Sequence, residues 1–154
     1  MIGFLKSKRK KIVAIANARM FSIDEVKEEM FSKKMLGPGL AFELKDGKIV
    51  SPCNGVITTF FPTGHAFGIS RNDGLELLVH IGINTVELNG KGFKKLKKQG
   101  DIVTAGEMVV DVDLDFLKNQ GYDTTVMLVV VSENADKLKF ISYGDVTRGK
   151  KINV

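Results

Sequence analysis

The stretch from Leu75 to Ile83 reads Leu-Glu-Leu-Leu-Val-His-Ile-Gly-Ile. Successive side chains of a β-strand point to opposite faces, so every second residue of this stretch shares one face. The expected core face carries five apolar side chains: Leu75, Leu77, Val79, Ile81 and Ile83. His80 then stands on the other face, between Leu78 and a glycine at position 82. The pattern predicts a strand with a histidine on its non-core face, open on the glycine side.

The rest of the chain alternates short apolar runs with turns that contain glycine or asparagine. Strands that recur about every 8–12 residues with polar turns between them are typical of an all-β sandwich or barrel. We therefore predict an all-β fold, an antiparallel β-sandwich with barrel character. The expected strands are 11–16, 40–44, 48–51, 55–60, 65–70, 76–83, 101–103, 108–112, 125–131 and 140–143.

Helix is expected in only one or two short segments. Residues 114–120 form the best candidate, because Asp113 is suited to cap the helix N-terminus and Gly121 follows its C-terminus. A single helical turn is expected at 135–138. Residues 22–29 have helical residue types, but a loop is equally compatible with their sequence.

The composition predicts a single domain in a reducing compartment. A chain of 154 residues buries a core large enough to fold without disulfides, and its only cysteine is Cys53. No apolar stretch approaches the ~18 residues of a membrane span. The apolar residues 12–16 after the basic start are fewer than the ~7 that a secretory signal needs. We therefore expect a cytoplasmic protein.

The excess of positive charge belongs to the N-terminus. Five of the 23 basic residues lie in the first eleven positions, which contain no acid: Lys6, Lys8, Arg9, Lys10 and Lys11. The remaining 18 basic residues match the 18 acidic ones, so nucleic-acid binding by a basic folded face is not expected. We expect residues 1–11 to be a solvated tail and 12–154 to be the domain. The alternative for the tail is weak membrane-surface contact through its apolar residues and cations.

The second histidine, His65, lies on the predicted neighbouring strand. The turn signal at 71–74, Arg-Asn-Asp-Gly, would join the strands 65–70 and 76–83 as antiparallel neighbours, so that the two rings meet. Thr63 shares the parity of His65 if no bulge intervenes, which brings its hydroxyl within reach of a ring nitrogen. A lone histidine is more often structural, but two on adjacent strands favour a functional pair.

Several kinds of chemistry are open to such a pair. Zinc usually takes three or four protein ligands, so a zinc site at His65 and His80 would need a partner to complete it. A serine-histidine-acid triad lacks its nucleophile elbow. A neutral imidazole is itself a nucleophile that takes and returns a phosphoryl group. This role is favoured, because Leu78 helps to desolvate the ring, His65 supplies a donor and Gly82 leaves access.

Residues 63–69, Thr-Gly-His-Ala-Phe-Gly-Ile, and residues 74–93 closely resemble the glucose-family enzyme IIA of the bacterial phosphoenolpyruvate-dependent sugar phosphotransferase system. The most specific part is Val-His-Ile-Gly-Ile at 79–83, followed by Thr-Val-Glu-Leu at 85–88. The resemblance runs from about Phe31 to the C-terminus. It implies a β-sandwich built on a duplicated hybrid motif and a phosphotransferase component that needs no cofactor.

The resemblance also implies a role for each site residue. His80 would accept a phosphoryl group from the histidine-containing phosphocarrier protein and pass it to a cysteine of an enzyme IIB domain of a sugar permease. His65 would donate to the phosphate, Thr63 would orient His65, and the carbonyl of Gly82 would hold the other nitrogen of His80. The alternative function is a regulatory binding module, whose phosphorylation state signals sugar supply to target proteins.

Two positions depart from the family pattern. Asn84 stands where many members carry aspartate, which leaves one negative charge fewer beside the phosphate, and Gly64 replaces a residue that is often asparagine. Partner proteins are expected to dock on a surface around the site, through a small and transient interface on the order of 1,200 Å² or less. Its expected residues are Phe31, Met35, Leu36, Phe61, Leu78, Gly82, Asn84, Val86 and Glu87.

Overall fold

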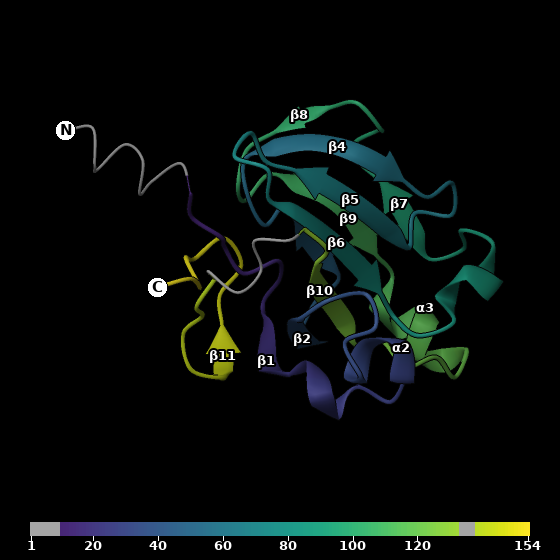
Figure 1. Cartoon of the computed structure of the whole chain (residues 1–154). Coiled ribbons are helices and arrows are strands. Elements are labelled where there is room, and N and C mark those ends of the chain that lie inside the picture. The colour runs from purple at the N-terminus through teal and green to yellow at the C-terminus, as the bar shows by residue number, and fades with distance from the viewer. Residues whose placement is uncertain (1–9, 133–137) are drawn as a thin grey trace.

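The computed structural model describes residues 10–132 and 138–154, and its strands form two antiparallel sheets (Figure 1). The larger sheet has eight strands in the order β11 (Gly144–Val146), β1 (Ala18–Ser22), β2 (Gly39–Leu44), β10 (Val126–Val130), β6 (Glu76–Ile81), β5 (Ala66–Ser70), β4 (Gly55–Phe60) and β8 (Ile102–Val103). The smaller sheet has the order β3 (Lys48–Val50), β9 (Met108–Val112) and β7 (Phe93–Lys95). The predicted all-β class is confirmed.

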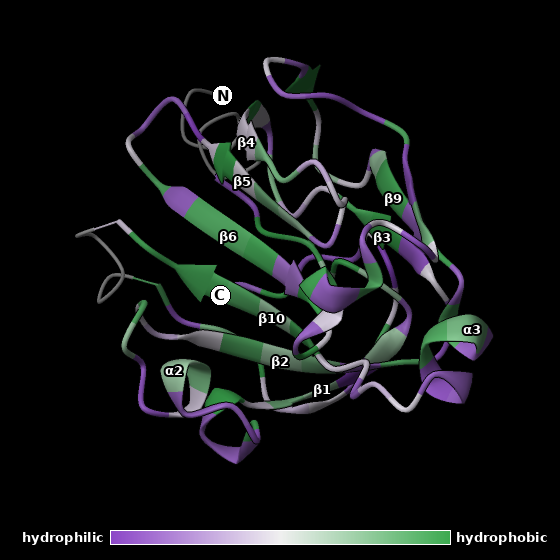
Figure 2. Ribbon diagram, turned by 90° about the vertical axis from the view of Figure 1, so that its right-hand side faces the viewer, coloured by the Kyte–Doolittle hydropathy of each residue, from purple (hydrophilic) through white to green (hydrophobic). Residues whose placement is uncertain are grey.

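The main core lies between the two sheets. It takes Leu77, Val79 and Ile81 from β6, which are at most 1% exposed, so the alternation predicted for this strand is confirmed. Figure 2 shows the hydrophobic residues that run along β6, β10 and β2 at the centre of the larger sheet.

A second, smaller core covers the outer face of the larger sheet. It consists of Ile23, Val26, Phe31, Ala41, Met127 and Val129. Two short elements bring its first members there, the 3-10 helix η1 (Ile23–Glu25) and the helix α2 (Glu29–Ser32). The face of β6 that carries His80 is therefore partly covered. Leu78, on that face, is half-buried against this core.

Most predicted strands are present, with shifts at their ends. The strands expected at 55–60 and 108–112 have these bounds, whereas the strand expected to reach Ile83 ends at Ile81. Ile83 therefore does not join the core between the sheets as predicted, and it packs against the smaller core instead. Gly82, with a φ of +80°, turns the chain out of the strand at this point.

Two expected strands do not form as strands. Residues 12–16 are fully buried, but they make only an isolated bridge from Val13 to Lys151 and backbone hydrogen bonds to neighbouring segments, among them the end of β3. The segment 140–143 likewise makes a single bridge, at Phe140. Sequence reasoning missed β1, β7 and β11. The strand β7 lies at a sheet edge within the lysine-rich residues 91–98, and its lysines are exposed.

The helix predicted at 114–120 is confirmed as α3 (Leu114–Asn119), and the Asp113 carboxylate accepts a hydrogen bond from the Phe116 amide at 3.1 Å. The ambiguous segment 22–29 holds η1, a loop and the start of α2. The turn predicted at 135–138 and most of the tail predicted at 1–11 fall outside the described residues. Within the described part of the chain, no helix has the length and apolar character to span a membrane.

Candidate functional site

His80 lies on the outer face of the larger sheet, in the middle of three strands. Its register partners are Ala66 on β5 and Met127 on β10, both buried. The ring of Phe31, carried by α2, lies over the imidazole with 5.1 Å between centroids. His80 is half-buried as a result, with one side of its ring enclosed by apolar groups.

Gly82 fixes the orientation of the His80 ring. Nδ1 of His80 donates a hydrogen bond to the Gly82 carbonyl oxygen at 2.9 Å, the contact that the resemblance implied. Only glycine fits here, because the φ of +80° is unfavourable for other residues and a Cβ would lie 2.4 Å from Thr85 Cγ2. Since a carbonyl oxygen only accepts, Nδ1 carries the proton and Nε2 keeps its lone pair.

His65 meets His80 from the turn between β4 and β5. The two ring centroids are 5.1 Å apart with planes at 81°, and the Phe61 ring lies 5.2 Å from the His65 ring. The Thr63 hydroxyl is in hydrogen-bond contact with Nδ1 of His65. The predicted juxtaposition of both histidines and Thr63 is thus present.

The backbone geometry that positions Thr63 and His65 differs from the predicted one. We expected Thr63 and His65 to share one strand face, but β5 begins at Ala66, so neither residue lies in the strand. The segment before β5 is a turn in which Gly64 has a φ of +78°, and this places the His65 ring against His80 on the outer face. The expectation from strand parity was wrong, because the turn at Gly64 changes the direction of the chain before β5.

Burial keeps both imidazoles neutral. The pKa of His80 is lowered to about 4, mainly by desolvation and to a lesser extent by the neighbouring His65, while the hydrogen bond to the Gly82 carbonyl acts in the opposite direction. Burial also lowers the pKa of His65. At neutral pH the site therefore presents an uncharged ring with a free Nε2 lone pair, the form in which histidine acts as a nucleophile.

The rim of the site is apolar and exposed on several sides. A depression of about 230 Å³ beside His80 is lined by Glu28, Met30, Phe31, Ile83, Asn84 and Val86. Among the expected surface residues, Met35, Leu36, Phe61, Asn84, Val86 and Glu87 are exposed. Phe31 and Gly82 are buried and Leu78 is half-buried, so these three pack around His80 and contribute little to the exposed rim.

The sequence and this geometry match a known family. The family model for the phosphoenolpyruvate-dependent sugar phosphotransferase system, EIIA 1, matches residues 10–136. The chain belongs to this EIIA family. The resemblance drawn from residues 63–93 is therefore confirmed.

Relatives of this EIIA chain include freestanding and fused proteins. It is 36% identical over 140 residues to the glucose-specific EIIA component of Borreliella burgdorferi, covering 91% of this chain and 73% of the relative. It is 38% identical over 141 residues to the glucose-specific EIICBA component of Staphylococcus carnosus, covering 92% of this chain and 21% of the relative. The EIIA chain thus spans about a fifth of the length of such multidomain relatives.

A solved structure supports the same assignment. The glucose permease IIA from Mycoplasma capricolum is similar with a TM-score of 0.89 and 34% sequence identity over 93% of both chains. The β-sandwich of this EIIA is therefore shared with a glucose-family IIA. The chain is a glucose-family EIIA component of the phosphotransferase system.

The two histidines are also candidate ligands of a metal ion. Among residues 10–132 and 138–154, no group of three or more histidine, cysteine, aspartate or glutamate side chains is arranged to hold a metal ion. The pair His65 and His80 supplies two nitrogen ligands, so zinc would still need ligands from a partner.

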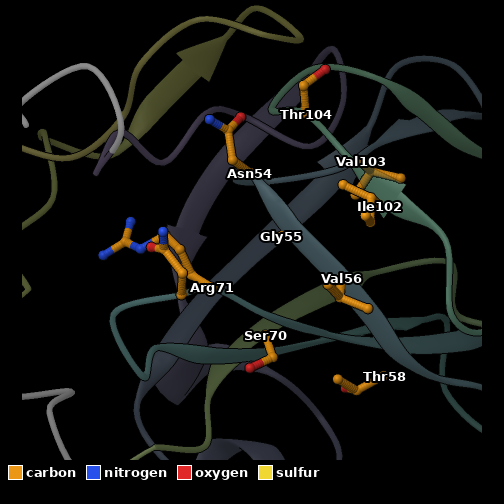
Figure 3. A pocket seen from close by; sticks show the side chains of 10 residues that line it. Asn54, Gly55, Val56, Thr58, Ser70, Arg71, Ile102, Val103 and Thr104 are labelled. Carbon is orange, nitrogen blue, oxygen red and sulfur yellow. The ribbon is translucent and has the colours of Figure 1, made fainter. Parts of the chain in front are cut away.

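A larger hollow of about 730 Å³ lies away from the histidines, over β4, β5 and β8 (Figure 3). Val56 and Ile102, two of its lining residues, are register partners on β4 and β8, and both are exposed. Its one ionisable lining residue, Arg71, is buried and bound to Asp73 at 2.7 Å and to the Lys10 carbonyl at 2.8 Å. These bonds tie the N-terminal end of the EIIA domain to the β5–β6 turn, which is a structural role.

Sequence reasoning missed several rim residues of the EIIA site. Glu28 and Met30 line the depression beside His80 because α2 folds back over the sheet. Their sequence carried no signal for this, since the position of a four-residue helix depends on tertiary packing rather than on local periodicity. Ile83 was assigned to the core and lines the rim instead.

Proposed function

We propose that this EIIA accepts a phosphoryl group on Nε2 of His80 from the histidine-containing phosphocarrier protein and passes it to a cysteine of an enzyme IIB domain. The observation that carries the proposal is the 2.9 Å hydrogen bond from His80 Nδ1 to the Gly82 carbonyl. It commits Nδ1 to the proton and directs the free lone pair of Nε2 away from the backbone. With a pKa of about 4, His80 is neutral at cytoplasmic pH and ready to attack.

In the transfer step, the bond between phosphorus and the donor nitrogen breaks as the bond to Nε2 forms. Positive charge develops on the His80 ring, because its lone pair is shared with phosphorus. The Gly82 carbonyl, which accepts the Nδ1 proton's hydrogen bond, stabilises that charge. Phosphoryl transfer requires positioning and charge stabilisation more than covalent assistance, and this arrangement provides both.

His65 is suited to bind the transferred group. If the Thr63 hydroxyl donates to Nδ1 of His65, the proton of His65 resides on Nε2 and is available for a phosphate oxygen. A phosphorylated side chain carries a charge near −2 at neutral pH. Such a charge raises the pKa of an adjacent imidazole, so His65 is able to take up a proton while the phosphate is bound and to release it afterwards.

The surroundings of His80 fit a short-lived protein contact. Beside the histidine pair, Phe61 is 40% exposed and Val86 is 50% exposed, whereas Phe31 is buried against the His80 ring. An apolar rim around a reactive group suits partners that must dock and leave, with a buried area on the order of 1,200 Å² or less.

Reconstitution of the full relay tests the proposal. Phosphoenolpyruvate, enzyme I, the phosphocarrier protein and a glucose-type IIB domain are combined with the wild-type chain or with His80→Gln, and sugar phosphorylation is followed. We expect sugar phosphate only with the wild type. His65→Gln is the matched control for the first step: it retains the acceptor nitrogen of His80, so this variant, unlike His80→Gln, should itself become phosphorylated. Sugar phosphorylation by His80→Gln at the wild-type rate would rule the proposal out.

A further inference from the structure

The lysines of residues 91–98 differ from one another in their surroundings. Residues 91–98 contain five lysines, and within the described part of the chain only Lys97 makes an ion pair, with Glu107 at 2.5 Å. Lys94 and Lys95 are both exposed on β7, the outer strand of the smaller sheet. Because strand neighbours point to opposite faces, these two cations project in different directions.

Lys95 faces the turn that carries His65. A Cβ placed on Gly64 would lie 3.1 Å from Lys95 Cγ, so the lysine stem packs against the residue that directly precedes His65. Its Nζ lies 5.6 Å from the centroid of the Phe60 ring, at the end of β4 where β7 passes (Figure 1). Lys95 therefore lies beside the turn that carries His65.

Lys94 has the same charge but faces acids. Its register partner is Asp111, and both residues line a surface depression together with Asp113. The field of Lys94 is thus partly offset on the far side of β7. In the depression beside His80 the charged lining residue is Glu28, and Asn84 is neutral. Lys95, by contrast, packs against Gly64, the residue directly before His65.

From this asymmetry we propose that Lys95 determines specificity for the phosphorylated form of the donor protein. The inference rests on the proposed function and adds a reason why the phosphorylated donor is preferred over the unphosphorylated one. A phosphorylated donor brings a charge near −2 to the unphosphorylated site, whereas the same donor after transfer does not. Lys95 attracts the phosphorylated donor but not the unphosphorylated one. The phosphorylated donor therefore associates faster, and the donor that has given up its phosphoryl group is not retained.

The expected size of the effect is modest and depends on salt. Consider one cation and a doubly charged phosphate that are separated by roughly 10 Å in water. Their attraction raises the rate of association about twofold to threefold at low ionic strength. Replacing lysine by glutamate removes the attraction and adds a repulsion of similar size. Lys95→Glu should therefore lower kcat/KM for His80 phosphorylation about fivefold at about 20 mM salt, and the loss should nearly vanish at about 300 mM.

The test compares Lys95→Glu with Lys94→Glu, which makes the same change of net charge on the opposite face of β7. Phosphorylation of the EIIA chain by the phosphorylated phosphocarrier protein is timed at both salt concentrations, after thermal melts establish that both variants are folded. We expect Lys94→Glu to stay within about twofold of the wild type, since its charge faces away from the site. Equal losses in the two variants would overturn the inference.

A second measurement separates phosphate recognition from ordinary docking. Binding of the unphosphorylated phosphocarrier protein is followed by calorimetry for the wild type and Lys95→Glu, and we expect affinities within about twofold of each other. A fivefold loss here would overturn the inference, because Lys95 would then contact fixed charges of the donor. Failure of the wild type to become phosphorylated at all would instead refute the proposed function.

Discussion

Replacing His80 by glutamine should make the protein less sensitive to acid. Folding holds the pKa of His80 at about 4, below the ordinary histidine value of 6.5. Between these two values the unfolded chain binds more protons at this position than the folded chain does. The contribution of His80 to stability is therefore intact above pH 6.5, and it is lost progressively as the pH falls toward 4.

The magnitude follows from the two pKa values. Integrated from about pH 8 to about pH 4.5, the difference corresponds to a loss of about 2.5 kcal/mol in the free energy of unfolding. Most of this penalty comes from desolvation of the ring beneath Phe31 and between β5 and β10. His80→Gln removes the titrating group while keeping a polar side chain, so this part of the pH dependence should disappear.

Urea unfolding of both proteins at the two pH values measures the effect. Carboxylates and His65 titrate in both proteins. The informative quantity is therefore the difference between the wild type and His80→Gln in how much free energy of unfolding each loses in acid. We expect this difference to be about 2.5 kcal/mol. Nuclear magnetic resonance titration of the His80 ring in the wild type should give a midpoint near pH 4 in parallel. Equal acid-induced losses, or a midpoint near 6.5, would refute the claim that burial holds this ring neutral.

Three further predictions concern the neighbours of His80 and the N-terminal tail. His65→Gln should still accept phosphate but pass it to enzyme IIB slowly, because an amide does not change its protonation state. Thr63→Ala should have a milder effect, since it removes one hydrogen bond worth about 0.5–1.5 kcal/mol. Single-turnover transfer rates of the two variants will rank their effects. Gly82→Ala should destabilise the fold by about 1–3 kcal/mol in urea unfolding and slow His80 phosphorylation, because the new Cβ would lie 2.4 Å from Thr85 Cγ2. Deletion of residues 1–9 should leave phosphorylation unchanged, and pelleting of the intact but not the truncated chain with anionic vesicles at low salt would assign the tail a membrane contact.

The sequence predicted the parts of the fold that repeat a simple pattern. Alternation in residues 75–81 placed Leu77, Val79 and Ile81 in the core and His80 outside it, and the structure agrees. The same reasoning failed for β7, because an edge strand exposed on most sides has no need for apolar alternation. It also failed for residues 12–16, which are buried without belonging to a regular sheet.

The candidate site was predictable in its members but not in its construction. The pairing of β5 with β6 follows from the turn at 71–74, and it brings His65 close to His80. The turn geometry at Gly64 was not readable from strand parity, because a positive φ redirects the side chains that precede β5. The cover formed by α2 and the approach of Lys95 are tertiary contacts between distant segments, which local patterns do not encode.

The most direct test of the account is the identity of the phosphorylated nitrogen. The wild-type chain is phosphorylated through phosphoenolpyruvate, enzyme I and the phosphocarrier protein, and nitrogen-15 and phosphorus-31 resonances then locate the phosphoryl group. The account predicts a single phosphohistidine at Nε2 of His80, with Nδ1 still protonated and bonded to the Gly82 carbonyl. Phosphate on Nδ1 of His80, or on His65, would contradict it.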